Sequence, residues 1–298
     1  MLSSFHYYYL DPHFKLMNGN FMSYHGQCDI LLSRIESFAS GLGLEVHIRT
    51  TRVDRSVNMA YSYISGAAVR IGSDVLEVLE SGMLLINGDA ATAQLVNEEE
   101  GRGNAAMADH RSLLISGYKI KSSAKGSHRR IFIHDLDLGN SNHVQIRANT
   151  LTGMLTVDLV GEVFGNSEGL ISGKNVADPA EDADNWEDTL LGVVGEDGLM
   201  ADRSTGYWNS YAESWQIKGD DNKLFHDTNR HPQYPVGCVY HTNKNLRGRR
   251  LIDSGESVVS LEVAKNMCAG KVAKKREYCI FDIMATGDLD LVNDPSYN

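Results

Sequence analysis

The sequence predicts a mainly β protein, an antiparallel β-sandwich with an appended C-terminal α-helical hairpin. Residues 44–50, LEVHIRT, alternate strictly between apolar and polar side chains, which is typical of a strand with one face in the core. Short apolar runs separated by glycine, serine and aspartate follow up to about residue 160. Many short strands with closely spaced turns favour an antiparallel sandwich or barrel over alternating βαβ units.

The remaining strands are predicted from the same kind of pattern. They are expected at 67–71, 75–78, 83–86, 113–120, 130–134, 144–147 and 151–160. The polar stretch 97–110 between two of these runs is expected to be an exposed loop. The span 178–202 holds nine acidic residues and no basic one, which predicts a surface insertion at about 176–206.

A hairpin is predicted near the start of the chain, at 11–29, DPHFKLMNGNFMSYHGQCD. Its two strands are joined by Asn18-Gly19, a dipeptide that accepts positive φ at both positions and is a strong hairpin signal. Cys28 stands at the end of this hairpin, where it is well placed to tie the sheet to a distant segment.

The composition changes after residue 215, and two helices are predicted beyond a proline-containing linker. Ser257 or Ser260 is expected to cap the first helix, which carries Leu261, Ala264 and Cys268 at helical spacing. The second is expected at about 272–286, with Gly287 as its stop.

The chain has 298 residues and a net charge of 28 minus 39, or −11, which argues against non-specific binding to nucleic acid or to an anionic membrane. Its longest apolar runs are shorter than the roughly 20 residues that cross a bilayer. The opening MLSSFHYYYL lacks the basic and apolar regions of a signal peptide, so we expect the natural N-terminus to lie upstream.

Four cysteines are present, at 28, 238, 268 and 279, and they allow three complete pairings. No two are spaced as Cys-x-x-Cys, which disfavours zinc binding and redox chemistry. Composition alone leaves open whether they are buried free thiols in a cytosolic protein or two disulfides formed in an oxidising compartment.

Several of these segments resemble the von Willebrand factor type D domain. The opening DPHF, Asn18-Gly19 and GQCD at 26–29 are similar to its first hairpin. GLISG at 169–173 stands where the family has its calcium loop, and SWQI at 214–217 is similar to its closing strand. The tail CIFDIMATGDLD at 279–290 is similar to tails that follow such domains in some proteins of single-celled algae.

The resemblance divides the chain into an N-terminal leader at 1–10, a type D β-sandwich at 11–226, and a linker with a cysteine-containing helical tail at 227–298. It implies an extracellular, calcium-organised module of adhesive or matrix proteins without catalytic activity. It also implies two disulfides, Cys28–Cys238 and Cys268–Cys279.

The family's calcium loop is altered in this sequence. Its two cysteine positions hold Glu168 and Ile171, so the resemblance implies no thiol exchange or covalent multimer assembly here. We predict that calcium, if it is retained, is bound by the remaining oxygen donors, and the alternative is an acidic loop without metal. The predicted ligands are Asn18, Asn175, Asp178 and Asp202.

Two other motifs suggest chemistry. GNSEG at 165–169 matches the Gly-x-Ser-x-Gly nucleophile elbow of hydrolases, but glycine and serine stand where its helix should begin. RGRR at 247–250 matches an Arg-x-Arg-Arg processing site, with Arg247, Arg249 and Arg250 as its basic residues; the alternative is a solvated basic loop.

We therefore expect a non-enzymatic extracellular module that binds a protein or a glycan matrix, with neither nucleic acid nor a membrane span. The sequence leaves two alternatives open. One is a secreted hydrolase that uses Ser167, and the other is a carbohydrate-binding β-sandwich.

Overall fold

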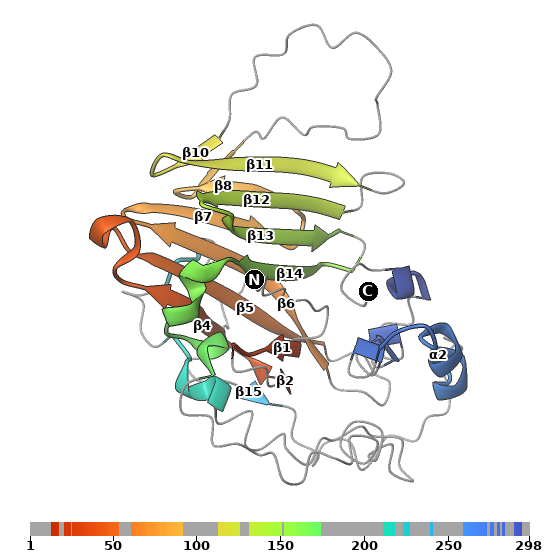
Figure 1. Ribbon diagram of the computed structural model, residues 1–298. Helices are drawn as coiled ribbons and strands as arrows, with labels where there is room; N and C mark the ends of the chain where they lie inside the picture. The colour runs from red at the N-terminus through yellow and green to blue at the C-terminus, as the bar shows by residue number, and fades with distance from the viewer. Residues whose placement is uncertain are drawn as a thin grey trace, which may run out of the picture.

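The computed structural model describes residues 13–17, 21–24, 26–53, 61–91, 113–125, 131–150, 152–173, 211–217, 223–226, 239–240, 259–272, 275–276, 279–280, 282–283 and 289–293. These residues form mainly antiparallel β-structure, which confirms the mainly β part of the predicted fold class (Figure 1). One 11-stranded sheet accounts for most of it, with two small two-stranded sheets beside it.

The strands of the large sheet are β4 (Asp29–Ile35), β5 (Leu44–Val53), β6 (Tyr61–Ile71), β7 (Asp74–Leu79), β8 (Leu84–Ile86), β9 (Asp89–Ala90), β10 (Leu113–Ile115), β11 (Tyr118–Lys125), β12 (Ile131–Gly139), β13 (Asn142–Asn149) and β14 (Met154–Val160). The small sheets pair β1 (His13–Lys15) with β2 (Phe21–Ser23), and β3 (Gly26–Gln27) with β15 (Val239–Tyr240).

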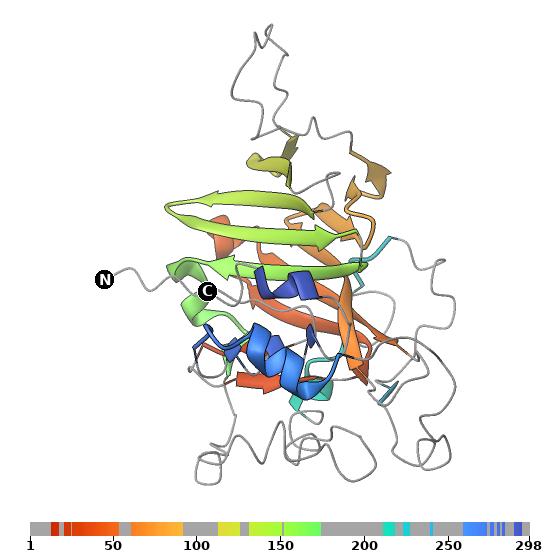
Figure 2. The same cartoon turned by 90° about the vertical axis from the view of Figure 1, so that its right-hand side faces the viewer.

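Strand β6 is the branch point of the large sheet. One of its edges pairs with β5 from Tyr61 to Ile71. Its other edge pairs with β14 at Ile64 and then with β7 from Gly66 onward. The sheet therefore curls back on itself, and the strands β10–β14 lie against β4–β8 as two layers (Figures 1 and 2).

The core lies between these layers. Leu44, Val46 and Ile48 of β5 are at most 1 % exposed, as their alternation predicts. Val144 and Ile146 of β13 belong to the same buried cluster from the other layer. Burying each such side chain stabilises the fold by roughly 1.5–3 kcal/mol.

The predicted strand 113–120 is wrong, because two strands and a turn occupy this stretch. Strands β10 and β11 are joined by Ser116 and Gly117, both of which have positive φ. This is the backbone of a two-residue hairpin, and a Ser-Gly pair indicates it less strongly than Asn-Gly does. The Ser116 hydroxyl donates to the backbone carbonyl of Ile71 at 2.7 Å, which ties the turn to β6.

The outer edge of β4 is covered by segments that are distant in sequence. Glu168 forms an antiparallel bridge with Arg34, and Gln216 forms one with Ile30. The backbone N–H of Leu31 donates to the carbonyl of Trp215 at 2.9 Å. The predicted closing strand 214–217 thus lies on this edge, as a single bridge that follows a helical turn at 211–214. An edge covered in this way does not template pairing with another chain.

The predicted opening hairpin is confirmed in its described part, where β1 and β2 pair in antiparallel register. Its Asn18-Gly19 turn lies outside the described residues. Immediately downstream, β3 pairs with β15, so the chain just before Cys28 lies beside the chain at Val239.

The first predicted C-terminal helix is α2 (Leu261–Met267). Ser260 is its cap, because the Ser260 hydroxyl accepts a hydrogen bond from the backbone N–H of Val263 at 3.3 Å. Cys268 and Cys279 form a disulfide with their Cα atoms 6.1 Å apart.

Residues 275–276, 279–280 and 282–283 are helical, whereas the rest of the predicted second helix lies outside the described residues. A short 3-10 helix, η6 (Leu289–Asn293), follows. Partial burial lowers the pKa of Lys275, and the charges of Lys15 and Lys271 lower it further.

Gly169 offers a test of how closely the covering segment packs on β4. Its φ is +118°, and a Cβ there would lie 2.6 Å from the backbone oxygen of Leu32. We expect Gly169→Ala to lower the free energy of unfolding by about 2–4 kcal/mol, measured by urea titration.

Gly165 is the matched control, because a Cβ at that position meets no atom within 4 Å. Gly165→Ala should change the stability by less than about 0.5 kcal/mol. Equal effects of the two substitutions would contradict the close packing of Gly169 against β4.

Candidate functional site

Most of the predicted site residues lie outside the described residues. This holds for Asn18, Asn175, Asp178 and Asp202, the four predicted calcium ligands, and for the basic motif of Arg247, Arg249 and Arg250. Within the described ranges, no group of three or more His, Cys, Asp or Glu side chains is placed to hold a metal ion.

The described part of the chain instead brings charged side chains together on the second face of β4, β5 and β6. Because side chains alternate along a strand, Glu45, His47 and Arg49 of β5 point away from the core formed by its apolar residues. They are nevertheless 9, 1 and 5 % exposed. Charged groups at this depth require partners, and the neighbouring strands supply them.

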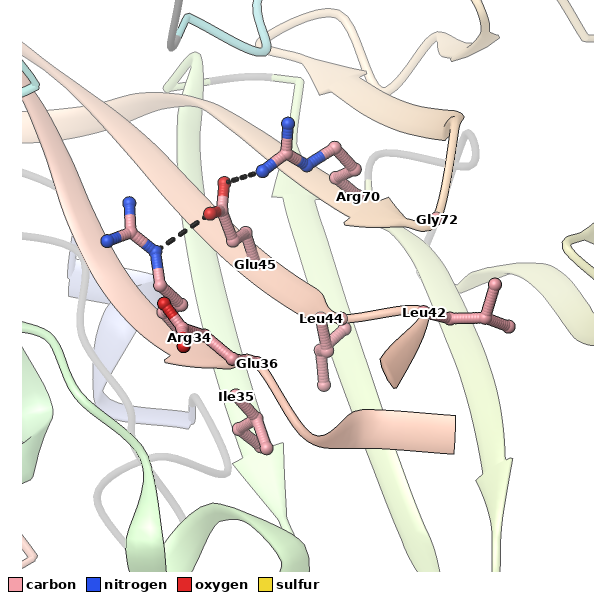
Figure 3. Close-up of a pocket in the computed structure, with 9 residues that line it drawn as sticks. Arg34, Ile35, Glu36, Leu42, Leu44, Glu45, Arg70 and Gly72 are labelled. Carbon is pink, nitrogen blue, oxygen red and sulfur yellow. Dashed lines mark hydrogen bonds and ion pairs between the residues drawn. The ribbon is translucent and has the colours of Figure 1, made fainter. Parts of the chain in front are cut away.

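Glu45 is the centre of the first cluster (Figure 3). On one side, the Nε of Arg34, a residue of β4, donates to the Glu45 Oε1 at 2.7 Å. On the other side, a terminal nitrogen of Arg70, a residue of β6, lies 2.7 Å from the Glu45 Oε2. These three residues stand directly opposite one another in the strand registers. The result is a cross-strand row of positive, negative and positive charge.

The surroundings of Glu45 shift its pKa strongly. Burial alone raises this pKa, but the contact with the His47 ring and the charges of Arg70 and Arg34 outweigh burial and lower it to about 2. The carboxylate therefore stays ionised.

Burial lowers the pKa of His47, against the opposing influence of Glu45. Its Nε2 lies 3.4 Å from the Glu45 Oε2, and neither ring nitrogen makes a well-aligned hydrogen bond within the described structure. His47 is therefore a neutral ring that is buried next to the ionised carboxylate of Glu45.

An open pocket of about 490 Å³ adjoins this row. Its walls come from the end of β4, the turn after the 3-10 helix η1 (Phe38–Gly41), and the ends of β5 and β6. The lining residues are Arg34, Ile35, Glu36, Leu42, Gly43, Leu44, Glu45, Arg70 and Gly72. Figure 3 shows the arginines and glutamates at one side and Leu42 beside Gly72 at the other.

A second ion pair lies further along the same face. Arg49 donates two hydrogen bonds to Asp29, at 2.7 and 2.9 Å, and both residues are at least 95 % buried. The ring of Phe225 lies 4.4 Å from the Arg49 guanidinium carbon. This bidentate pair and its aromatic cover are sealed from solvent, so they are suited to holding residues 223–226 against the sheet.

The candidate nucleophile Ser167 is not placed for attack. It is 0 % exposed, and its hydroxyl hydrogen-bonds to the Met17 sulfur at 3.9 Å. It lies between two 3-10 helices, η2 (Glu162–Asn166) and η3 (Leu170–Ser172), rather than between a strand and an α-helix. A nucleophile elbow needs the second arrangement, with an exposed hydroxyl.

Cys28 is fully buried and disulfide-bonded, and the Tyr24 hydroxyl lies 2.9 Å from its sulfur. Its predicted partner Cys238 lies outside the described residues. Within the β3–β15 pairing, the pair nearest to Cys28 is that of Gln27 with Val239. The Cys28–Cys238 bond stays a prediction.

The fold and site define a β protein with buried ion pairs on the second face of its sheet and a disulfide in its helical tail. Comparison with protein-family models found no match, and comparison with curated proteins found none either. None of the helices in the described ranges combines the length and apolar character needed to cross a membrane.

Sequence reasoning missed Arg34, Glu45 and Arg70 as a group. The alternating charges of β5 were visible in the sequence and predict a polar second face. The neighbours of Glu45 could not be predicted from the sequence. Arg34 and Arg70 belong to the strands on either side of β5, and the alternation of side chains does not indicate which strands become neighbours.

The Glu45 cluster predicts how stability depends on pH. The pKa of Glu45 falls from 4.5 to about 2 on folding, so its contribution is complete above pH 4.5 and is lost as the pH falls towards 2. We expect a loss of roughly 1–2 kcal/mol in this window, after allowing for solvent around the arginines. Urea titrations of the wild type and of Glu45→Gln measure it.

In Glu45→Gln, the part of the unfolding free energy that the wild type loses between pH 4.5 and 2 through Glu45 should no longer be lost. Glu80→Gln, a substitution at an exposed turn residue, is the control and should lose as much stability in this window as the wild type. Both variants should still lose stability as the pH falls below 6.5, because buried His47 has a lowered pKa and the unfolded chain takes up that proton first. If Glu45→Gln and the wild type lost the same stability between pH 4.5 and 2, the assignment of this loss to Glu45 would be contradicted.

Proposed function

We propose that this protein is a non-enzymatic extracellular interaction module, which binds a partner in an adhesive or matrix setting. The observation that carries the proposal is the state of its described cysteines: Cys28, Cys268 and Cys279 are all in disulfides. Structural disulfides persist in oxidising compartments and are rare in the cytosol.

The type D family is the framework of this proposal. Its support is the antiparallel two-layer body, the hairpin β1–β2 that precedes Cys28, and the closing segment 214–217 on the edge of β4. In this framework the Cys28–Cys238 bond fastens the opening hairpin to the segment after the sandwich, and the Cys268–Cys279 bond stabilises the helical tail.

A secreted hydrolase gains no support from the site. Ser167 is buried against Met17, so a substrate carbonyl has no access to its hydroxyl in this conformation. The carbohydrate-binding alternative is favoured by a specific observation, because the pocket beside Glu45 combines guanidinium donors with carboxylate acceptors.

The proposal is tested by peptide mass spectrometry of the unreduced protein together with a serine-directed fluorophosphonate probe. We expect two intact links, Cys28–Cys238 and Cys268–Cys279, and no labelling of Ser167. Free thiols at all four cysteines would contradict the extracellular assignment, and a labelled Ser167 would contradict the non-enzymatic one. Ser167→Ala is the control for probe specificity.

Calcium binding is the second testable part. If the predicted ligands hold calcium, then Asp178→Asn together with Asp202→Asn should weaken calcium binding on the order of tenfold, because each change removes a carboxylate from the site. Isothermal titration calorimetry measures the affinity. Asp137→Asn, on the exposed surface of β12, is the matched control. A wild-type protein that binds no calcium would remove calcium from the proposal.

A further inference from the structure

The arginines beside Glu45 retain donors that the carboxylate does not use. Arg34 contacts Glu45 through Nε, and Arg70 contacts it through one terminal nitrogen. The side chains of Arg34 and Arg70 are 32 and 39 % exposed, so the rest of each guanidinium is reachable from the pocket. A guanidinium has five N–H donors, and two on one edge match the two oxygens of a carboxylate.

Glu45 also fixes the two arginines in place. Each long side chain is held at 2.7 Å to one carboxylate that stays ionised down to about pH 2. A ligand therefore meets guanidinium groups whose side-chain freedom is already restricted, which lowers the entropic cost of binding.

The charges of the pocket narrow the class of ligand. Arg34 and Arg70 are balanced by Glu45 and by Glu36, which is exposed at the rim. A ligand that offers only negative charge would be repelled by Glu36. A ligand with one carboxylate and several hydroxyl groups suits both parts, because its carboxylate accepts from an arginine and its hydroxyls donate to Glu36.

The shape of the pocket is consistent with one unit of a longer chain. The pocket is open to solvent, and its volume of about 490 Å³ is enough for a single sugar ring with water. Leu42, which is 51 % exposed, gives the pocket an apolar wall on the side away from the charged row (Figure 3).

We propose that this pocket binds a uronic acid residue of an acidic polysaccharide, with the sugar carboxylate on Arg34 and Arg70 and a sugar hydroxyl on Glu36. The inference rests on the proposed function, whose glycan-matrix partner it narrows to a class. Its test is independent of the disulfide and serine-probe measurements, so each can fail alone.

The experiment is calorimetric titration of the full-length oxidised protein with a hexamer of galacturonic acid. A neutral maltohexaose and a hexaglutamate peptide are the comparison ligands. We expect binding of the uronate hexamer alone. Equal binding of hexaglutamate would overturn the sugar assignment, equal binding of maltohexaose would overturn the role of the carboxylate, and no binding at all would overturn the proposal.

Variants test the individual contacts. Arg34→Lys keeps a cation for Glu45 but loses the two-donor edge, so this variant should bind uronate more weakly. Combined with Arg70→Gln, it should weaken uronate binding on the order of 10- to 100-fold. Lys119→Gln, at an exposed position on β11, should leave the affinity unchanged. Near-UV circular dichroism shows whether each variant keeps the fold, and unchanged affinity in a folded Arg34→Lys would contradict the proposal.

Glu36→Ala separates a sugar site from a simple anion site. If Glu36 accepts a sugar hydroxyl, then its removal weakens uronate binding several-fold, in keeping with the loss of one hydrogen bond to a charged group. If the pocket is a plain anion site, removal of this negative charge strengthens binding. A tighter complex with Glu36→Ala would therefore overturn the uronate assignment.

Discussion

The structure depends on the backbone pairing of β6, which is hydrogen-bonded on both edges and shared between two layers. Its pairing with β5 continues along its length, while its other edge passes from β14 to β7 within a few residues. The backbone groups of a buried strand must be satisfied by neighbours, so the sheet curls where one partner replaces another. The core between the layers and the charged second face both follow from this geometry.

The second face shows how a sheet can bury charge. Glu45 lies between Arg34 and Arg70, and Asp29 holds Arg49 through two hydrogen bonds. Such pairs add little net stability when both charges are desolvated, but removal of one partner leaves the other uncompensated. What differs between them is access: the Asp29 pair is closed over by Phe225, whereas the Glu45 row opens into a pocket. The first is therefore suited to structure and the second to recognition.

The covered edge of β4 relates the fold to the proposed extracellular setting. Backbone bonds from Glu168 and Trp215 occupy the edge that β5 leaves free, and β15 does the same for β3. The pairing of β3 with β15 is only two residues long, and the proposed Cys28–Cys238 bond would add a covalent constraint to it. The covered edge of β4 therefore presents side chains rather than open backbone to its surroundings.

By itself, the sequence determined the strands and helix whose signal is local. The alternation at 44–50, the cap Ser260 and the β1–β2 hairpin follow from side-chain period and turn or cap chemistry within a few residues. Tertiary structure alone decided the branch at β6, the burial of Ser167 and the meeting of Arg34, Glu45 and Arg70. Each of these depends on which strands become neighbours, and period-two alternation is the same for every order of strands.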